Sequence, residues 1–446
     1  MKKQEDIKRE YLKLLPVQII GILVSATNAL IDSVITGRYI GSEALGAIGL
    51  FAPVISAVGF FMILITGFEI LCSNAMGKKD SKEASALFST CIFMAALLCI
   101  LSTAICILFR AVLSQLLGAD KSSKQLLMDY ISGYSLGFVG DVLCAIFMIF
   151  LPLNDDTKKS YFGLVAMISS NIILDLVNVL VLDMGTFGMG LASSASYLLS
   201  AAIMLPGFTK RGRLLKLGFK NLKFKDMPEA IRLGSPNLMF TLGTVVKAYV
   251  FNRVLVSSFG IPAIATTNVQ GTLCSFLGAI PQGCAGAFLF IGSMYYGSKD
   301  KKSFTQGFSF AMKIGAALSA TAAAVLMIFS GMIASFYFDF NEEAYIMTRD
   351  MLLVFPSFLI FNTALNLLLK VYQSQGKITL VNVFSIAENL MIAGLAVVLI
   401  KVIGINGAWI AFPLTELICI LLVCADIVFN GKNGEEPVRE WISVKG

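Results

Sequence analysis

The stretch from Ala86 to Arg110, ALFSTCIFMAALLCILSTAICILFR, contains no charged residue before Arg110. A helix needs roughly 20 apolar residues to cross the hydrocarbon core of a bilayer, so this stretch predicts a membrane-spanning helix. Similar runs recur from about Leu12 to Ile427. Over the whole chain 57% of residues are hydrophobic and 14% are charged, against about 25% charged in an ordinary soluble domain. Most of the apolar surface therefore has to face lipid.

The apolar runs predict an all-α polytopic membrane protein of about twelve transmembrane helices. We expect these helices at residues 12–37, 46–75, 86–110, 125–152, 160–183, 186–208, 229–257, 264–296, 304–334, 345–373, 378–402 and 404–429. No segment outside them is large enough to form a domain. The first run has full length and follows a charged segment, so we expect it to be retained as an anchor and not cleaved as a signal peptide.

The distribution of Lys and Arg predicts the orientation of the chain, because basic residues accumulate in cytoplasmic loops. With the spans above, 26 of the 35 basic residues fall on the side that holds both termini. We therefore expect a multi-pass protein of the cell membrane with both termini in the cytoplasm. The densest basic stretch, Lys210 to Lys225, could bind nucleic acid, but a topology signal with some attraction to lipid head groups is favoured.

Histidine and cysteine usage argues against an enzyme. The chain has no His, which removes Ser-His and Cys-His nucleophile pairs and the commonest zinc ligands. Its nine Cys residues all fall in the predicted spans without CxxC spacing, as expected for small helix-packing residues and not for disulfides or a metal site. We expect no enzymatic activity and no cofactor.

An internal repeat divides the chain into halves. An offset of 220 residues aligns Pro16 with Pro236, and Gly77-Lys78-Lys79-Asp80 with Gly297-Ser298-Lys299-Asp300. Six spans in each half is an even number, so the halves are related by an axis along the membrane normal, with a central cleft between them. Such a parallel repeat suits alternating access, in which two lobes rock about a substrate site.

This repeat predicts the domain organisation. We expect an N-terminal lobe at residues 1–208, a cytoplasmic linker at 209–228, a C-terminal lobe at 229–430 and a cytoplasmic tail at 431–446. Proline removes a backbone hydrogen bond from a helix and permits a bend. Pro16 and Pro236 are the best hinge candidates, because they recur in the repeat.

Ionisable residues at membrane depth are costly, so each is a functional candidate. The predicted spans contain few of them, namely Asp32, Glu69, Asp141, Asp175, Lys247, Glu388 and Glu416. The offset of 220 residues pairs Asp32 with Asn252. Near the end of each half the offset is 219, which pairs Asp175 with Gly394, Ser169 with Glu388 and Tyr197 with Glu416. None of these acids is matched by an acid at the equivalent position of the other half, so the shared fold does not require them. We therefore expect the two halves to differ in function.

The fifth span carries a polar stripe. Asn171, Asp175 and Asn178 stand at i, i+4 and i+7, which places them on one helix face. Asp175 lies about 15 residues from the cytoplasmic start of its span, or roughly 22 Å along the helix. Asp32 reaches a similar depth in the first span, which runs in the same direction. The two acids are therefore expected to meet in the N-terminal lobe.

Two buried carboxylic acids that lie close together can be neutral at one step and charged at another, as coupling to a proton gradient requires. Carboxylate oxygens with asparagine amides can equally bind a small hard cation such as Na⁺. A Na⁺ site at Asp32, Asp175 and Asn171 is therefore possible, and the sequence does not separate it from a proton site. The alternative is a purely structural hydrogen-bonded pair between the first and fifth helices.

Lys247 lies too deep in its span for easy snorkelling and needs a partner. Glu388 and Glu416 are the nearest candidates by depth, and a structural ion pair and a gating role are both open. Asp141 is mid-membrane and is a candidate for the cleft lining.

The order and spacing of several motifs resemble the MATE family of multidrug and toxic compound extrusion transporters, in its bacterial multidrug-pump branch. The first half carries Leu15-Pro16, Ile31-Asp32, Gly41 with Glu43-Ala44-Leu45-Gly46, Gly77-Lys78-Lys79-Asp80, Asn171-Ile172-Ile173-Leu174-Asp175 and Gly188-Met189-Gly190-Leu191-Ala192-Ser193. The second half carries Gly297-Ser298-Lys299-Asp300, Gln373-Ser374-Gln375-Gly376-Lys377, Gly404-Ile405-Asn406-Gly407-Ala408-Trp409, and Ala411-Phe412-Pro413 followed by Glu416. The resemblance covers the whole chain.

The resemblance implies an antiporter that exports organic, often cationic, small molecules in exchange for H⁺ or Na⁺. The family's N-lobe acids carry over to Asp32 and Asp175, with Asn171 as their companion. Several members carry an acid in span 7 or 8, where this chain has Lys247 and Gln282, and this departure makes a preference for cationic drugs less secure. We expect a monomer whose partners are its substrates and membrane lipids, with no nucleic acid.

Two other functions compete. A flippase for a lipid-linked sugar or another anionic lipid should have a cavity rich in Arg and Lys, whereas these spans hold one deep Lys against several acids. A membrane-embedded transferase should show clustered loop acids or His with metal spacing, and only Asp155-Asp156 hints at that.

Overall fold

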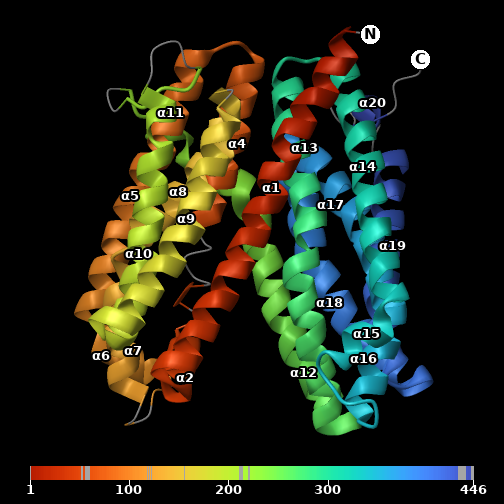
Figure 1. Cartoon of the computed structure of the whole chain (residues 1–446). Helices are drawn as coiled ribbons and strands as arrows, with labels where there is room; N and C mark the ends of the chain where they lie inside the picture. Colours follow the sequence, from red (N-terminus) through yellow and green to blue (C-terminus); the bar gives the residue numbers. More distant parts are fainter. Residues whose placement is uncertain are drawn as a thin grey trace. The chain divides into compact units, whose positions relative to one another are not determined.

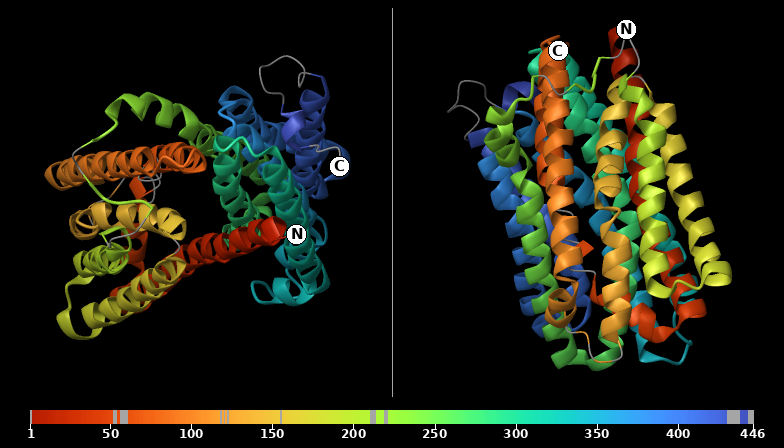
Figure 2. Two further views of the ribbon diagram at one scale, coloured as in Figure 1. Left: turned by 90° about the horizontal axis from the view of Figure 1, so that it is seen from above. Right: turned by 90° about the vertical axis from the view of Figure 1, so that its left-hand side faces the viewer.

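The computed structural model describes residues 2–51, 54–55, 61–117, 119, 121, 123–154, 156–209, 214–218, 221–429 and 438–442. Within these ranges the secondary structure is helical and contains no strand, so the prediction of an all-α protein is confirmed. The chain forms two compact units, an N-terminal unit (Ile20–Gly234) and a C-terminal unit (Met1–Ile19 with Ser235–Gly446). In each unit the long helices run roughly alongside one another as a bundle (Figure 1 and Figure 2).

The N-terminal unit is built from short and long helices in chain order. It contains the second half of α1 (Lys2–Ile35), η1 (Thr36–Ile40), α2 (Ser42–Leu50), α4 (Phe61–Gly77), α5 (Ser81–Leu108), α6 (Arg110–Leu116), α7 (Ser123–Ser135), α8 (Phe138–Phe150), η2 (Leu151–Asn154), α9 (Thr157–Val177), η3 (Asn178–Leu182), α10 (Gly185–Met204), α11 (Pro206–Thr209), η4 (Phe224–Asp226) and the first turns of α12 (Met227–Leu277).

The C-terminal unit starts with the first residues of α1 and continues from within α12. Its other helices are α13 (Ala279–Gly297), α14 (Lys301–Ile328), α15 (Ser330–Ser335), α16 (Glu343–Val354), η5 (Phe355–Ser357), α17 (Phe358–Ser374), α18 (Ile378–Ile403), α19 (Asn406–Phe429) and α20 (Arg439–Ile442).

Ten helical segments of the described residues are long and apolar enough to cross a membrane. The fourth predicted span corresponds to α7 and the helix after it, which meet at a 46° bend, and the second contains the shorter apolar helix α4. Leu108 and Phe162 are 77% and 67% exposed, which suits side chains that face lipid. The chain is therefore a multi-pass membrane protein.

The two compact units divide inside helices. In the C-terminal unit, the Tyr11 hydroxyl of α1 donates to the Cys284 carbonyl oxygen at 3.2 Å. In the N-terminal unit, a Cβ on Gly67 would lie 1.9 Å from the Ala230 carbonyl oxygen, so α4 and the start of α12 touch through their backbones. The units meet near Ile19 and Gly234 in sequence, beside Pro16 and Pro236. Parts of the predicted 209–228 linker and of the tail lie outside the described residues, as does Asp155.

The internal repeat has a direct structural counterpart in the turns that carry the repeated motif. Lys79 and Lys299 both adopt the left-handed conformation, with φ of 64° and 55°. The next residues, Asp80 and Asp300, cap the following helices by accepting the backbone N–H three residues on, at 2.9 and 3.1 Å. The two helices that follow, α5 and α14, each have 28 residues. The sequence repeat therefore encodes the same helix stop and helix start twice.

A second packing feature positions the candidate site, namely the close crossing of α7 and α10. A Cβ on Gly190 would lie 2.5 Å from the backbone nitrogen of Tyr134, and one on Gly133 would lie 2.3 Å from the Phe187 carbonyl oxygen. The Ser194 hydroxyl donates to the Gly133 carbonyl oxygen at 2.7 Å. Small residues at such contacts allow membrane helices to approach through their backbones.

Removing either repeated helix cap should destabilise the protein. We expect Asp80→Ala and Asp300→Ala each to lower the free energy of unfolding by about 1 kcal/mol, because the first turn loses its side-chain acceptor. Asp→Asn at the same positions keeps an acceptor and serves as the control. Unfolding of the purified protein in detergent measures this, and equal stability of the Ala and Asn variants would contradict the capping role.

The close crossing predicts a second effect on stability. Gly190→Ala should lower the thermal unfolding midpoint, because overpacking a tight contact costs about 1–3 kcal/mol. Gly394→Ala in α18 is the matched control, since a Cβ there meets nothing within 4 Å. If the two variants have the same thermal unfolding midpoint, the packing of α7 against α10 does not require a glycine at this contact.

Candidate functional site

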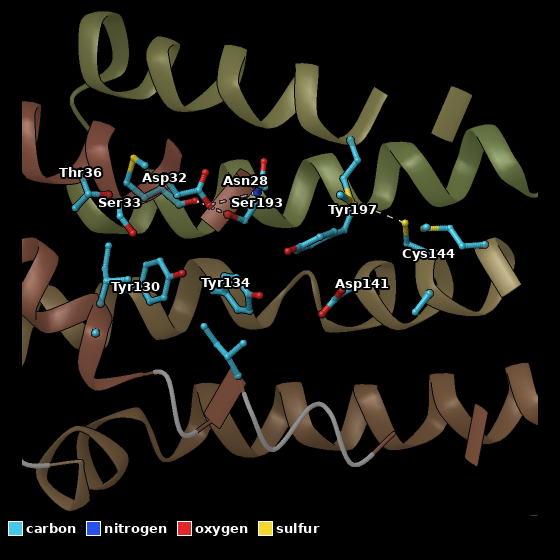
Figure 3. A pocket seen from close by; sticks show the side chains of 17 residues that line it. Asn28, Asp32, Ser33, Thr36, Tyr130, Tyr134, Asp141, Cys144, Ser193 and Tyr197 are labelled. Atoms are coloured by element: carbon cyan, nitrogen blue, oxygen red, sulfur yellow. Dashed lines mark hydrogen bonds between the residues drawn. The ribbon is translucent and has the colours of Figure 1, made fainter. Parts of the chain in front are cut away.

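The N-terminal unit encloses a cavity of about 500 Å³ (Figure 3). Its lining comes from α1, η1, α2, α7, α8, α9, α10 and Ile55. The 17 lining residues are Asn28, Asp32, Ser33, Thr36, Ile48, Gly49, Ile55, Tyr130, Tyr134, Asp141, Cys144, Ala145, Met148, Met167, Met189, Ser193 and Tyr197. This set contains two carboxylates and no Lys or Arg, so its fixed charge is negative when the acids are ionised.

Three tyrosines form an aromatic side to this cavity. The rings of Tyr130 and Tyr134 stack with centroids 5.5 Å apart, and the Tyr197 ring meets Tyr134 edge-on at 6.4 Å. Figure 3 shows Tyr134, Tyr197 and Asp141 directed toward one another. Asp141 thus joins a carboxylate to aromatic faces, a combination that attracts organic cations.

Four polar side chains form a group that we call the N-terminal acid pair with its amides. They are Asn28 and Asp32 from α1 and Asn171 and Asp175 from α9. The Asn28 amide nitrogen donates to Asp32 Oδ2 at 3.5 Å. Asp175 is fully buried, and its carboxyl group interacts with that of Asp32. The structure therefore brings Asp32 and Asp175 together, as their common depth predicts.

Several atoms of this group have no conventional hydrogen-bond donor or acceptor among the described residues. They are Asn28 Oδ1, Asp32 Oδ1, both amide atoms of Asn171 and both carboxyl oxygens of Asp175. An unsatisfied buried polar group costs about 1–3 kcal/mol, and more when it is charged. A proton shared by the two carboxyl groups, or a small cation among the oxygens, would satisfy the oxygen atoms that it contacts, and the Asn171 amide nitrogen would still need an acceptor. The donor set fits either ligand.

Local helix geometry explains how the four side chains converge. In α1 and in α9 an Asn precedes an Asp by four residues, so each pair lies on one helix face. Each helix then passes into a π-helical turn, η1 at Thr36 and η3 at Asn178. Such turns interrupt regular helix geometry and are frequent at functional sites.

Asn178, the third member of the predicted stripe, is engaged elsewhere. Its amide nitrogen donates to the Gly185 carbonyl oxygen at 3.0 Å, and its Oδ1 accepts from the Met184 backbone N–H at 3.2 Å. A Cβ on Gly188 would lie 1.8 Å from Asn178 Oδ1. This side chain therefore holds the loop between η3 and α10.

The C-terminal unit contains a second buried charged group, which we call the C-terminal charge cluster: Lys247, Asn362, Glu388, Phe412 and Glu416. Glu416 is fully buried and Glu388 is 5% exposed. The Asn362 amide donates to Glu416 Oε1 at 2.8 Å. The two Glu carboxyl groups interact with each other, and Lys247 interacts electrostatically with both.

Lys247 makes no ion pair within 4.0 Å among the described residues. Its Nζ lies 5.5 Å from the centroid of the Phe412 ring, which gives it a cation–π contact in place of a direct carboxylate contact. The remaining predicted residue, Gln282 of α13, is exposed and makes no side-chain hydrogen bond to the cluster within the described part of the chain.

Sequence reasoning missed Asn28, Asn362 and the cavity tyrosines. Asn28 had a usable signal, because the spacing of Asn28 and Asp32 repeats that of Asn171 and Asp175. Asn362 is one of two Asn residues at i and i+4 in α17, where the Asn366 amide donates to the Asn362 Oδ1 at 3.0 Å. The tyrosines gave no signal, because an aromatic residue in a membrane helix more often packs or faces lipid.

Comparison with known proteins gives one consistent result. The family model described as MatE matches residues 16–179 and 238–398. "Probable multidrug resistance protein YoeA" of Bacillus subtilis is 21% identical over 428 residues, 92% of this chain and 91% of the relative. "Multidrug export protein MepA" of Staphylococcus aureus is 23% identical over 407 residues, 90% of this chain and 89% of the relative.

Solved structures agree at the level of the fold. A crystal structure of the Vibrio cholerae MATE transporter VcmN matches with a TM-score of 0.88 at 16% sequence identity, over 99% of this chain and 100% of that one. Because the family model covers most of the chain and reaches both halves, this chain belongs to the MatE family, the multidrug and toxic compound extrusion (MATE) transporters, which are transporters and not enzymes.

Proposed function

We propose that this transporter is a secondary active antiporter that exports organic, cationic or amphipathic compounds in exchange for H⁺ or Na⁺. The observation that carries the proposal is the buried Asp32–Asp175 pair beside a cavity whose lining holds Asp141, three tyrosines and no Lys or Arg. The relatives named as multidrug resistance and multidrug export proteins support it.

The cavity is suited to a flat organic cation. Its volume of about 500 Å³ lies within the range of about 300–1,000 Å³ that is usual for small-molecule sites. The rings of Tyr134 and Tyr197 offer π faces to a positive charge. Met148, Met167 and Met189 add flexible apolar surface, which can adapt to ligands of different shape.

The coupling cation and the organic cation are exchanged because both are attracted by the negative charge of Asp32 and Asp175. While Asp32 and Asp175 are loaded with H⁺ or Na⁺, the cavity has lost negative charge and binds an organic cation more weakly. Two unit charges roughly 6 Å apart at an effective dielectric constant of about 20 interact by about 3 kcal/mol. That energy corresponds to roughly a 100-fold change in affinity, which is enough to couple release of one cation to binding of the other.

The remaining parts of the proposal rest on the sequence. The basic loops support a position in the cell membrane with both termini in the cytoplasm. The six-plus-six repeat supports alternating access between two lobes about a central cleft. We propose a monomer surrounded by lipid. An anionic lipid substrate is less well supported, because the lining of the described cavity has no basic residue.

The coupling role of the acid pair predicts loss of gradient-driven transport in Asp175→Asn. The amide keeps the size of the carboxyl group but cannot cycle between charged and neutral forms. Ethidium transport in inverted membrane vesicles with imposed pH or Na⁺ gradients measures this, and we expect at least a roughly 100-fold loss of gradient stimulation.

The matched control is Asp183→Asn, which makes the same chemical change at an exposed position just after η3. Asn tolerates the left-handed backbone conformation of Asp183, so this variant should transport normally. Full gradient-driven transport by Asp175→Asn would end the coupling assignment.

Asp141 should contribute to affinity for positively charged substrates. We expect Asp141→Asn to weaken ethidium binding about 10-fold, or about 1.4 kcal/mol, because one carboxylate leaves the cavity lining. Fluorescence polarisation of the purified protein measures the affinity. Binding of an uncharged aromatic dye is the internal control, and equal weakening for both dyes would indicate collapse of the cavity instead of lost charge.

A further inference from the structure

The function proposed above assigns no role to the C-terminal charge cluster. A membrane-spanning helix does not require buried ionisable side chains, so their presence here calls for an explanation. Three ionisable side chains meet there, from α12, α18 and α19. Burying such groups is costly unless their charges are compensated and their polar atoms are bonded.

We propose that the Glu388 and Glu416 carboxyl groups hold one exchangeable proton between them, with Lys247 as the compensating positive charge of a second, proton-specific site. The site lies wholly within the C-terminal unit and is separate from the Asp32–Asp175 pair. It would bind H⁺ whether the N-terminal pair uses H⁺ or Na⁺.

The hydrogen bonds leave one position open for a proton. Glu416 Oε1 accepts the Asn362 amide at 2.8 Å. Glu416 Oε2 has no conventional hydrogen-bond partner among the described residues, although Glu416 is fully buried. The Glu388 carboxyl group interacts with that of Glu416. A proton between the two carboxyl groups supplies the missing hydrogen bond.

The charge count requires the same proton. Lys247 contributes one positive charge and the two ionised acids two negative charges, so the cluster without a proton carries a net charge of −1. One proton makes it neutral. The other titratable groups that face it are the thiols of Cys274 and Cys419, which are neutral in their thiol form. Within the described part of the chain, no further ionised group therefore balances the second carboxylate.

The oxygen atoms of the cluster favour a proton over a metal cation. A hard metal cation collects several oxygen ligands, whereas a proton needs only the two carboxyl groups. Asn362 Oδ1, the other side-chain oxygen of the cluster, already accepts the Asn366 amide. The N-terminal acid pair has further oxygens without a hydrogen-bond partner among the described residues, Asn28 Oδ1 and Asn171 Oδ1, so the two sites differ in the cation that they can accept.

Infrared difference spectroscopy of the full-length protein in liposomes tests the proposal, because a protonated carboxyl group has its own C=O band. We expect a pH change to reveal one protonated carboxyl in an Asp32→Asn, Asp175→Asn background. Adding Glu416→Gln or Glu388→Gln should remove it, since the remaining acid is neutralised by Lys247. Adding Lys247→Met should give two protonated carboxyl groups, because both acids then need a proton.

The control is Asp426→Asn on α19, a carboxyl that accepts the Tyr372 hydroxyl at 2.6 Å and lies outside the cluster. It should leave the band unchanged. Persistence of the band in both Gln variants, or an unchanged proton count in Lys247→Met, would overturn the proposal. The measurement needs no transport, so its outcome is independent of whether the N-terminal acid pair couples export. If one of the Glu388→Gln, Glu416→Gln and Lys247→Met variants fails to fold, the others still test the site.

Discussion

A polar group inside a bilayer has no water to bind it, and the rest of this structure depends on that constraint. Most of the chain meets it with helices that bond their own backbone. Where side chains are concerned, the protein meets it by concentrating its ionisable groups in a few places. Asp32 and Asp175 share one site in the N-terminal unit, and Lys247, Glu388 and Glu416 share another in the C-terminal unit. Elsewhere large apolar side chains cover the helices.

The two units use one helix plan for different electrostatic tasks. The turns at Lys79 and Lys299 and the caps at Asp80 and Asp300 are the same device. The repeat also pairs Tyr197 of the N-terminal cavity with Glu416 of the C-terminal charge cluster, so one position lines a site in both units. In the first half it offers an aromatic face, and in the second half it offers a carboxylate. The fold thus conserves where a site can form and leaves its chemistry to the side chains.

The sequence was sufficient for the fold and for part of the site. Apolar runs predicted the helices, because lipid demands about 20 residues for each crossing, and the depth of Asp32 and Asp175 predicted their meeting. Helical spacing did not predict that Asn178 bonds the neighbouring loop, since periodicity specifies a helix face but not the bonds that a side chain makes. The Lys247–Phe412 contact and the aromatic side of the cavity depend on packing between distant segments, which spacing along the chain does not encode.

The central claim is that a coupling cation and an organic cation compete for the negative field around Asp32 and Asp175. The most direct test is the affinity of the purified protein for ethidium, measured at equilibrium while the H⁺ and Na⁺ concentrations are varied separately. The account predicts that affinity falls as one of these cations rises, and that this dependence disappears in the Asp32→Asn, Asp175→Asn double variant. An affinity independent of both cations in the unaltered protein would contradict it.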